Sequence, residues 1–147
     1  MQADRPVREI MTTRVVTVTP DASADMVKEI FRKNNFHHIP VIDQTTDALL
    51  GIVSMEDFFK QAYLLSLDTG GKRYSEKAYE SLHARDFMTE DPLFIEPDDT
   101  IGLAADIFLA NQFHALPIVD EGKLVGIITT HDLLSFVFNS NYVEKGE

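Results

Sequence analysis

The sequence GIITTHD occupies residues 126–132, and a close counterpart, GIVSMED, occurs earlier at residues 51–57. Each stretch has a glycine, two β-branched residues, a hydroxyl residue, two variable positions and an aspartate. Because the hydroxyl and the carboxylate are three positions apart, a helix that begins at the hydroxyl holds both groups at its N-terminal end. Such a pair can cap the helix, and it can also hydrogen-bond a ribose diol. For a single copy the cap is the simpler interpretation.

The residues before each copy predict a small sheet with helices. In the first half, β-branched residues and turn residues predict strands, and apolar residues at helical spacing after Ser23, a typical N-cap, predict an amphipathic helix. The expected elements are a strand at 15–18, a helix at 24–34, strands at 39–42 and 49–53, and a helix from residue 58.

The same order of elements returns in the second half, because the sequence is duplicated. Residues 7–43 align with residues 84–120 without a gap, and a two-residue difference in the following turn then aligns the two motifs. Twelve positions carry the same residue in both halves of the gap-free part, far more than composition alone would give. They are Arg8, Met11, Thr12, Pro20, Asp21, Ile30, Phe31, Asn34, Phe36, His37, Pro40 and Asp43, with Arg85, Met88, Thr89, Pro97, Asp98, Ile107, Phe108, Asn111, Phe113, His114, Pro117 and Asp120 as their counterparts.

Length and composition limit the possible functions. At 147 residues the chain can form two small units that share a core, since one repeat alone buries too little apolar surface to be stable. The net charge of -11 disfavours nucleic acid and membrane surfaces as partners. Without cysteine there is no thiolate metal site or disulfide. The N-terminus has no stretch of signal-peptide type, so we expect a cytoplasmic protein.

We therefore expect an α/β fold of the α+β kind, in which two halves, each a small β-sheet with two helices, pack face to face about a pseudo-twofold axis. Such packing would create two related clefts, each with one copy of the motif. A polar pair at the same point of two clefts is easier to explain as a binding feature than as a cap.

The whole pattern resembles a tandem pair of CBS (cystathionine-β-synthase type) domains. The similar features are the segments VREIMT, HHIPVID and GIVSMED in the first half, with RDFMT, HALPIVD and GIITTHD in the second. The resemblance implies CBS domain 1 at residues 7–67, a linker at 68–83 and CBS domain 2 at 84–142. It also implies a regulatory module, often called a Bateman module, that senses adenine nucleotides or S-adenosylmethionine and commonly forms homodimers.

The resemblance also implies which residues bind the ligand. Ser54, Asp57, Thr129 and Asp132 match the positions that contact ribose in the family. Apolar positions that enclose the adenine correspond to Val16 and Ile127 for the Asp132 cleft, and to Leu93 and Ile52 for the Asp57 cleft.

The phosphate side departs from the family pattern. The positions that meet phosphate correspond to His37, His38 and His114, where stronger phosphate binders often carry arginine at the positions of His38 and Ala115. Histidine is only partly protonated at neutral pH, and Arg14, or Lys72 and Arg73 in the linker, could compensate. We therefore expect AMP, ADP or an uncharged-tail adenosyl ligand to be favoured over tightly held ATP, with unequal affinities at the two clefts. The alternative for His37 and His114 is a packing or surface role.

The alternatives to a ligand-sensing module are an enzyme and a purely structural module. An enzyme is disfavoured, because the sequence has no paired metal-ligand spacing, nucleophile elbow or phosphate loop. We expect neither a catalytic residue nor a metal site. A structural module that only dimerises or docks on another protein stays open, with the apolar C-terminal helix at residues 133–138 as its interface.

Overall fold

The computed structural model describes residues 2–68, 80–111 and 113–146. The chain divides into two compact units that differ from the sequence repeats. Unit 1 contains residues 1–15 and 93–147, and unit 2 contains residues 16–92. Each unit therefore combines the body of one repeat with the short segment that begins the other. We name these segments the first lead-in, residues 7–12, and the second lead-in, residues 84–89.

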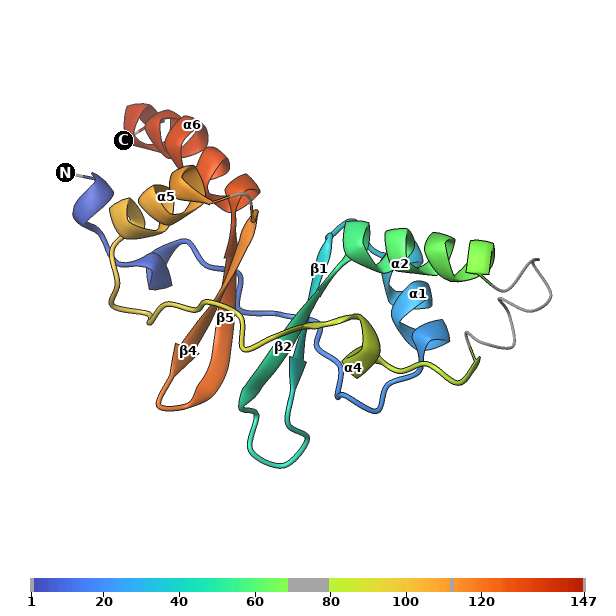
Figure 1. The fold of residues 1–147 in the computed structure, drawn as a ribbon. Coiled ribbons are helices and arrows are strands. Elements are labelled where there is room, and N and C mark those ends of the chain that lie inside the picture. The colour runs from blue at the N-terminus through green and yellow to red at the C-terminus, as the bar shows by residue number, and fades with distance from the viewer. Residues whose placement is uncertain (1, 69–79, 112, 147) are drawn as a thin grey trace. The chain divides into compact units, whose positions relative to one another are not determined.

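Unit 2 is a three-stranded antiparallel sheet with helices (Figure 1). The strands β1 (His38–Ile42), β2 (Leu49–Ser54) and β3 (Thr89–Glu90) pair in that order. The helices are α1 (Ala24–Lys33), α2 (Met55–Asp68) and the short α4 (Ala84–Phe87). The predicted helix and the second and third predicted strands are thus confirmed to within about two residues, and the last helix begins three residues earlier than predicted.

Unit 1 repeats this plan with a two-stranded sheet (Figure 1). The antiparallel strands β4 (Ala115–Asp120) and β5 (Lys123–Thr129) form a hairpin, and the helices are α5 (Ile101–Ala110) and α6 (Thr130–Gly146). Two short 3-10 helices, η1 (Gln2–Asp4) and η2 (Val7–Glu9), come from the start of the chain. Both halves are α+β, as predicted.

The prediction of a strand at residues 15–18 is wrong. This segment is extended, but it makes only an isolated parallel bridge from Val18 to Val41. The equivalent bridge in unit 1 joins Ile95 to Ile118. In each unit the segment reaches the hairpin edge through two hydrogen bonds and then turns at a proline and an aspartate. Of the β-branched residues in this segment, only Val18 is buried, and no full ladder forms.

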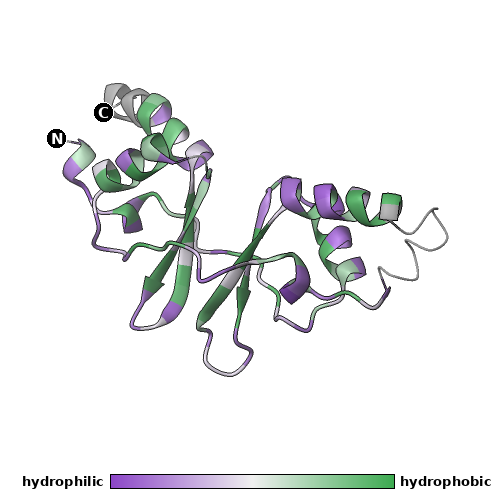
Figure 2. Cartoon of the chain, viewed as in Figure 1, coloured by the Kyte–Doolittle hydropathy of each residue, from purple (hydrophilic) through white to green (hydrophobic). Residues whose placement is uncertain are grey.

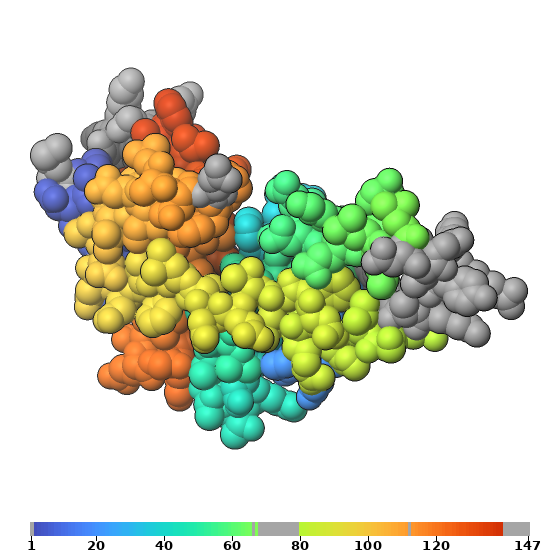
Figure 3. Space-filling view, viewed as in Figure 1, coloured from blue at the N-terminus to red at the C-terminus, as the bar shows by residue number. Residues whose placement is uncertain are grey.

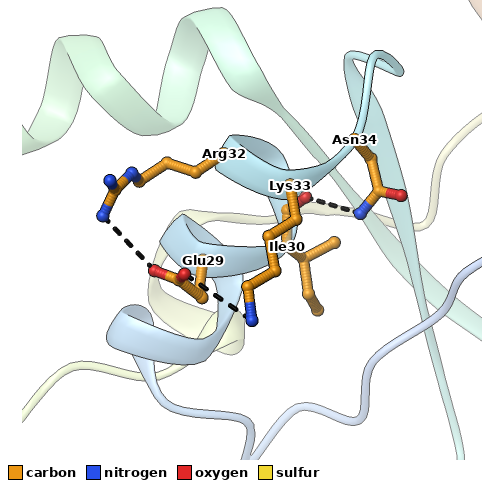
Figure 4. Close-up of polar contacts among 5 residues, drawn as sticks. All are labelled: Glu29, Ile30, Arg32, Lys33 and Asn34. Carbon is orange, nitrogen blue, oxygen red and sulfur yellow. Dashed lines mark hydrogen bonds and ion pairs between the residues drawn. The ribbon is translucent and has the colours of Figure 1, made fainter.

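Local signals at the helix ends act as expected. Ser23 accepts a hydrogen bond from the Met26 N–H at 3.1 Å and caps α1. Figure 4 shows the other end of α1, where the Asn34 side chain donates to the Ile30 carbonyl at 2.8 Å and Glu29 pairs with Arg32 and Lys33. In unit 1, Asn111 closes α5 in the same way. The duplicated asparagines thus serve as matched C-terminal caps.

Each unit has its own apolar core. In unit 2 the core includes Phe31, Phe58 and Phe87, and the ring of Phe58 contacts the rings of the other two. In unit 1 it includes Val7, Phe108 and Ile128. Figure 2 shows hydrophobic ribbon along the strands and hydrophilic residues at the hairpin turns. Phe87 and Val7 belong to lead-ins, so each core is completed by a residue from the other repeat.

The two lead-ins dock through matching contacts. In unit 1, the Val7 and Arg8 N–H groups donate to the Asp99 and Pro97 carbonyls, and the Arg8 guanidinium pairs with Asp98. In unit 2, the Ala84 and Arg85 N–H groups donate to the Ala22 and Pro20 carbonyls, and Arg85 pairs with Asp21. The second lead-in, yellow-green in Figure 3, forms part of the surface of unit 2. The matched arginine, proline and aspartate pairs of the repeat are explained by this docking.

Candidate functional site: two helix starts

The second motif forms a reciprocal cap at the junction of β5 and α6. The Asp132 N–H donates to the Thr129 hydroxyl oxygen at 3.0 Å, and the Thr129 N–H donates to Asp132 Oδ2 at 3.0 Å. Both residues are half-buried. The helix start therefore fixes the carboxylate in place and leaves Oδ1 without a bond from the motif itself.

The first motif forms half of this arrangement at the junction of β2 and α2. The Asp57 N–H donates to the Ser54 hydroxyl oxygen at 3.1 Å. Within the described residues, no return bond joins the Ser54 N–H to the Asp57 carboxylate, and Asp57 is exposed. The predicted pairing of hydroxyl and aspartate at a helix start is confirmed in both units, with different hydrogen bonding.

The backbone carbonyls of two predicted histidines accept hydrogen bonds from these helix starts. The Thr130 N–H donates to the His114 carbonyl at 3.0 Å, and the Met55 N–H donates to the His37 carbonyl at 2.8 Å. His38 is paired with Ser54 in the sheet, as Ala115 is with Thr129. Each unit thus brings the backbone of its histidine position next to the motif.

The motif glycines are required by the lead-ins. A Cβ on Gly126 would lie 2.8 Å from Met11 Sδ and 3.0 Å from the Thr12 carbonyl oxygen. A Cβ on Gly51 would lie 2.6 Å from Met88 Sδ and 2.8 Å from the Thr89 carbonyl oxygen. At these distances a larger side chain at either glycine requires the lead-in to shift. Each motif therefore begins at the point where a lead-in crosses its strand.

The other predicted residues are divided between the units. Ile127 is buried and lies in unit 1 with Thr129, Asp132 and His114, and the exposed Arg14 belongs to the same unit. The half-buried Ile52 lies in unit 2 with the first motif.

Val16 and Leu93 each belong to the unit opposite to the motif with which they were predicted to act. Their side chains are 41% and 53% exposed. Lys72 and Arg73 lie outside the described residues.

Sequence reasoning missed Thr12. Its backbone exchanges hydrogen bonds of 2.8 and 3.0 Å with Ile127, and its hydroxyl oxygen lies 3.4 Å from both Oδ1 and Oδ2 of Asp132. The identity of Thr12 and Thr89 in the repeat was a signal of importance. It did not reveal the partner, which is 120 positions away.

The described part of the chain contains neither a cluster of metal ligands nor a membrane-spanning helix. Across residues 2–68, 80–111 and 113–146, no group of three histidine or acidic side chains is placed to hold a metal ion. Over the same ranges, every helix is too short or too polar to cross a membrane.

Comparison with known sequences identifies the family. A family profile described as CBS domain matches residues 7–63 and 84–139. These matches cover most of the chain and coincide with the two sequence repeats. The chain belongs to the CBS domain family, as the resemblance predicted, and carries two tandem copies of the domain.

Individual relatives are similar over nearly the whole chain. Protein MJ1225 of Methanocaldococcus jannaschii is 29% identical over 97% of the chain, which spans 48% of that relative, about half its length. CBSX2, a CBS-pair protein of Arabidopsis thaliana, has a structure solved in complex with AMP. That structure is 31% identical, with a TM-score of 0.75, over 93% of this chain and 98% of its own. The CBS domain of a membrane protein from Sphaerobacter thermophilus is 29% identical, with a TM-score of 0.73. The alignment covers 91% of this chain and 88% of that structure's chain.

Proposed function

We propose that the protein is a regulatory module that senses an adenine nucleotide or related adenosyl ligand and does not itself catalyse a reaction. The observation that carries this proposal is the duplicated hydroxyl–aspartate pair at the starts of α2 and α6 in a CBS pair. The complex of CBSX2 with AMP supports the ligand class, because that relative is similar over almost the entire chain.

Ribose recognition falls to Ser54 and Asp57 in one site and to Thr129 and Asp132 in the other. A carboxylate accepts hydrogen bonds from both hydroxyls of a diol, and a serine or threonine hydroxyl can donate or accept. The free N–H groups at a helix start add a field that favours electronegative ligand atoms. The cap and the ribose site use the same residues, since the cap leaves carboxylate oxygens available.

The remainder of the ligand is assigned to the other predicted positions. Val16 with Ile127, and Leu93 with Ile52, supply apolar surface for adenine. Arg14, His37, His38 and His114 serve the phosphate side. Histidine is in general a weaker cation than arginine at neutral pH, so a short phosphate tail or an uncharged tail is favoured over a triphosphate.

The signal passes through self-association or a protein partner. A bound ligand shifts a conformational equilibrium only by its difference in affinity for the two states. The helices α2 and α6 expose matching apolar side chains, with Phe59 and Tyr63 on α2 and Leu134 and Phe138 on α6. These positions recur at helical spacing on one face of each helix, so both faces are candidates for homodimer contacts.

These exposed faces also favour a second function, a structural module that dimerises without a nucleotide. The two functions differ in the response to ligand. A ligand that binds only the folded state raises the melting temperature, whereas a module without a ligand site shows no change.

Thermal unfolding with AMP, ADP, ATP and S-adenosylmethionine at millimolar concentration tests the proposal. We expect at least one ligand to raise the midpoint and the double variant Asp57→Asn/Asp132→Asn to abolish the rise. Asparagine keeps an acceptor for the cap, which protects the fold. Asp106→Asn on α5 is the matched control for the loss of an exposed carboxylate. A panel with no shift in the unchanged protein would contradict sensing and favour the structural module.

A further inference from the structure

The two aspartates of the proposed sites are held to different degrees. Asp132 is half-buried, and its Oδ2 accepts a hydrogen bond of 3.0 Å from the Thr129 N–H. Asp57 is exposed, and only its backbone N–H is bonded within its motif. The Asp132 side chain therefore has a fixed orientation before any ligand arrives, and the Asp57 side chain does not.

Thr12 adds to this difference. Its hydroxyl lies 3.4 Å from each oxygen of Asp132, longer than the about 2.5–3.0 Å usual for a hydrogen bond between oxygens, so the contact is weak and shared between the two oxygens. It is held there by the backbone pairing of Thr12 with Ile127. A donor at equal distance from both oxygens limits rotation of the carboxylate without saturating it, so Oδ1 stays available to a ligand hydroxyl.

The equivalent threonine in unit 2 does not do this. Thr89 pairs with Ile52 as Thr12 pairs with Ile127. Among the residues that the structure describes, however, no hydrogen bond joins the Thr89 hydroxyl to Asp57. The chain therefore contains a matched pair of threonines, of which one contacts its aspartate.

The charges at the two helix starts differ in the same sense. The first turn of α2 carries Glu56 beside Asp57, whereas the first turn of α6 carries His131 beside Asp132. A second carboxylate disfavours a ligand that bears phosphate, and a histidine does not. Both the hydrogen bonding and the charge thus favour the Asp132 motif.

We propose that the Asp132 motif is the tighter of the two adenosyl sites and that Thr12 is its positioning residue, which acts by orienting the Asp132 carboxylate. The proposal rests on the proposed function and adds the order of the two sites. Ordering a free side chain on binding weakens affinity by about two- to tenfold, and the Asp132 site has largely avoided that cost. The first lead-in thereby couples the ligand site of the second repeat to the start of the chain.

Isothermal titration with AMP of single-site variants tests the order of affinities. The variant Asp57→Asn keeps the Asp132 site intact, and Asp132→Asn keeps the Asp57 site intact. We expect the first variant to bind AMP at least about threefold more tightly than the second. Equal affinities, or tighter binding by Asp132→Asn, would overturn the proposal while the proposed function stands. If the unchanged protein binds none of AMP, ADP, ATP and S-adenosylmethionine, the proposed function fails, and this proposal fails with it. If it binds another of these ligands but not AMP, the same titrations with that ligand decide the order of the sites.

The role of Thr12 is tested in the Asp57→Asn background. Thr12→Val should weaken AMP binding about two- to tenfold, and Thr12→Ser, which keeps the hydroxyl, should restore it. Thr89→Val in the Asp132→Asn background is the matched control and should leave AMP affinity unchanged. Melting temperatures measured without ligand show whether the variants fold normally. Both valine variants keep the backbone pairing, so we expect similar melting temperatures, and a loss of AMP affinity is then due to positioning and not to unfolding. Equal losses in the two valine variants, or no rescue by serine, would refute the positioning role.

Discussion

Substituting Gly126 by alanine tests the docking of the first lead-in on the second motif. The added Cβ would lie 3.0 Å from the Thr12 carbonyl oxygen, which itself accepts a 3.0 Å hydrogen bond from the Ile127 N–H. Met11 Sδ, at 2.8 Å, can move because it belongs to a flexible side chain. The carbonyl oxygen can move only if the pairing between the lead-in and β5 is distorted.

The expected loss follows from two opposing effects. Overpacking a tight contact costs about 1–3 kcal/mol, whereas replacing glycine by alanine reduces the entropy of the unfolded chain and returns about 0.4–1 kcal/mol. Because the close contact is with backbone, the first effect should dominate. We expect a net loss of about 1–2 kcal/mol in the free energy of unfolding, and a melting temperature lower by about 2–8 °C.

Urea unfolding followed by circular dichroism measures this change. Gly51→Ala is the matched variant in unit 2 and should lose at least as much stability, since its contacts with Met88 and Thr89 are closer, at 2.6 and 2.8 Å. Thr13→Ala, at an exposed position next to the lead-in, is the control and should change the free energy by less than about 0.5 kcal/mol. A Gly126→Ala variant as stable as this control would refute the argument that the glycines admit the lead-ins.

Three further predictions concern charge, the lead-in ion pairs and association. Hydrogen bonds from the Thr45 and Thr46 N–H groups hold the pKa of Asp43 below its usual value, so the ionised carboxylate stabilises the fold at neutral pH and this effect is lost as pH falls through the lowered pKa. Asp43→Ala should therefore lower the urea midpoint at pH 7. A difference between the variant and the unchanged protein that persists fully in strong acid would contradict this cause. A double-mutant cycle on the exposed Arg8–Asp98 pair should give a coupling of about 0.2–1 kcal/mol that shrinks in high salt, and a salt-independent coupling would rule out an ion pair as its source. The double variant Leu134→Glu/Phe138→Glu should shift the sedimentation coefficient toward that of the monomer. Lys60→Glu on α2 is the control for added negative charge. If the double variant sediments like the unchanged protein, the α6 face is not a dimer contact.

Much of the candidate site could be predicted because its chemistry is local. The hydroxyl and the aspartate are three residues apart, so a helix start brings them together whatever the surroundings. The same holds for Ser23, the predicted N-cap of α1. The strand predicted at residues 15–18 was wrong for a tertiary reason: its β-branched residues satisfy the pattern for a strand, but only Val18 reaches a neighbouring strand.

The contacts of Thr12 could not be predicted from local pattern. The duplication showed that a threonine recurs at positions 12 and 89, yet the shared Met-Thr pair gave no reason for one of them alone to contact an aspartate. That difference depends on how each motif closes its cap, which involves the burial of Asp132 and the exposure of Asp57.

By itself, the sequence determined the family, the duplication and the helix caps, because these depend on residue types at short spacing. Only the tertiary structure decided which half of the chain each lead-in completes. Arg8, Met11 and Thr12 meet Asp98, Gly126 and Ile127 across long sequence separations, and their counterparts do the same in unit 2. The two similar repeats offer each lead-in two chemically similar docking surfaces, so local pattern cannot choose between them. Packing of the folded chain selects the surface in the other repeat.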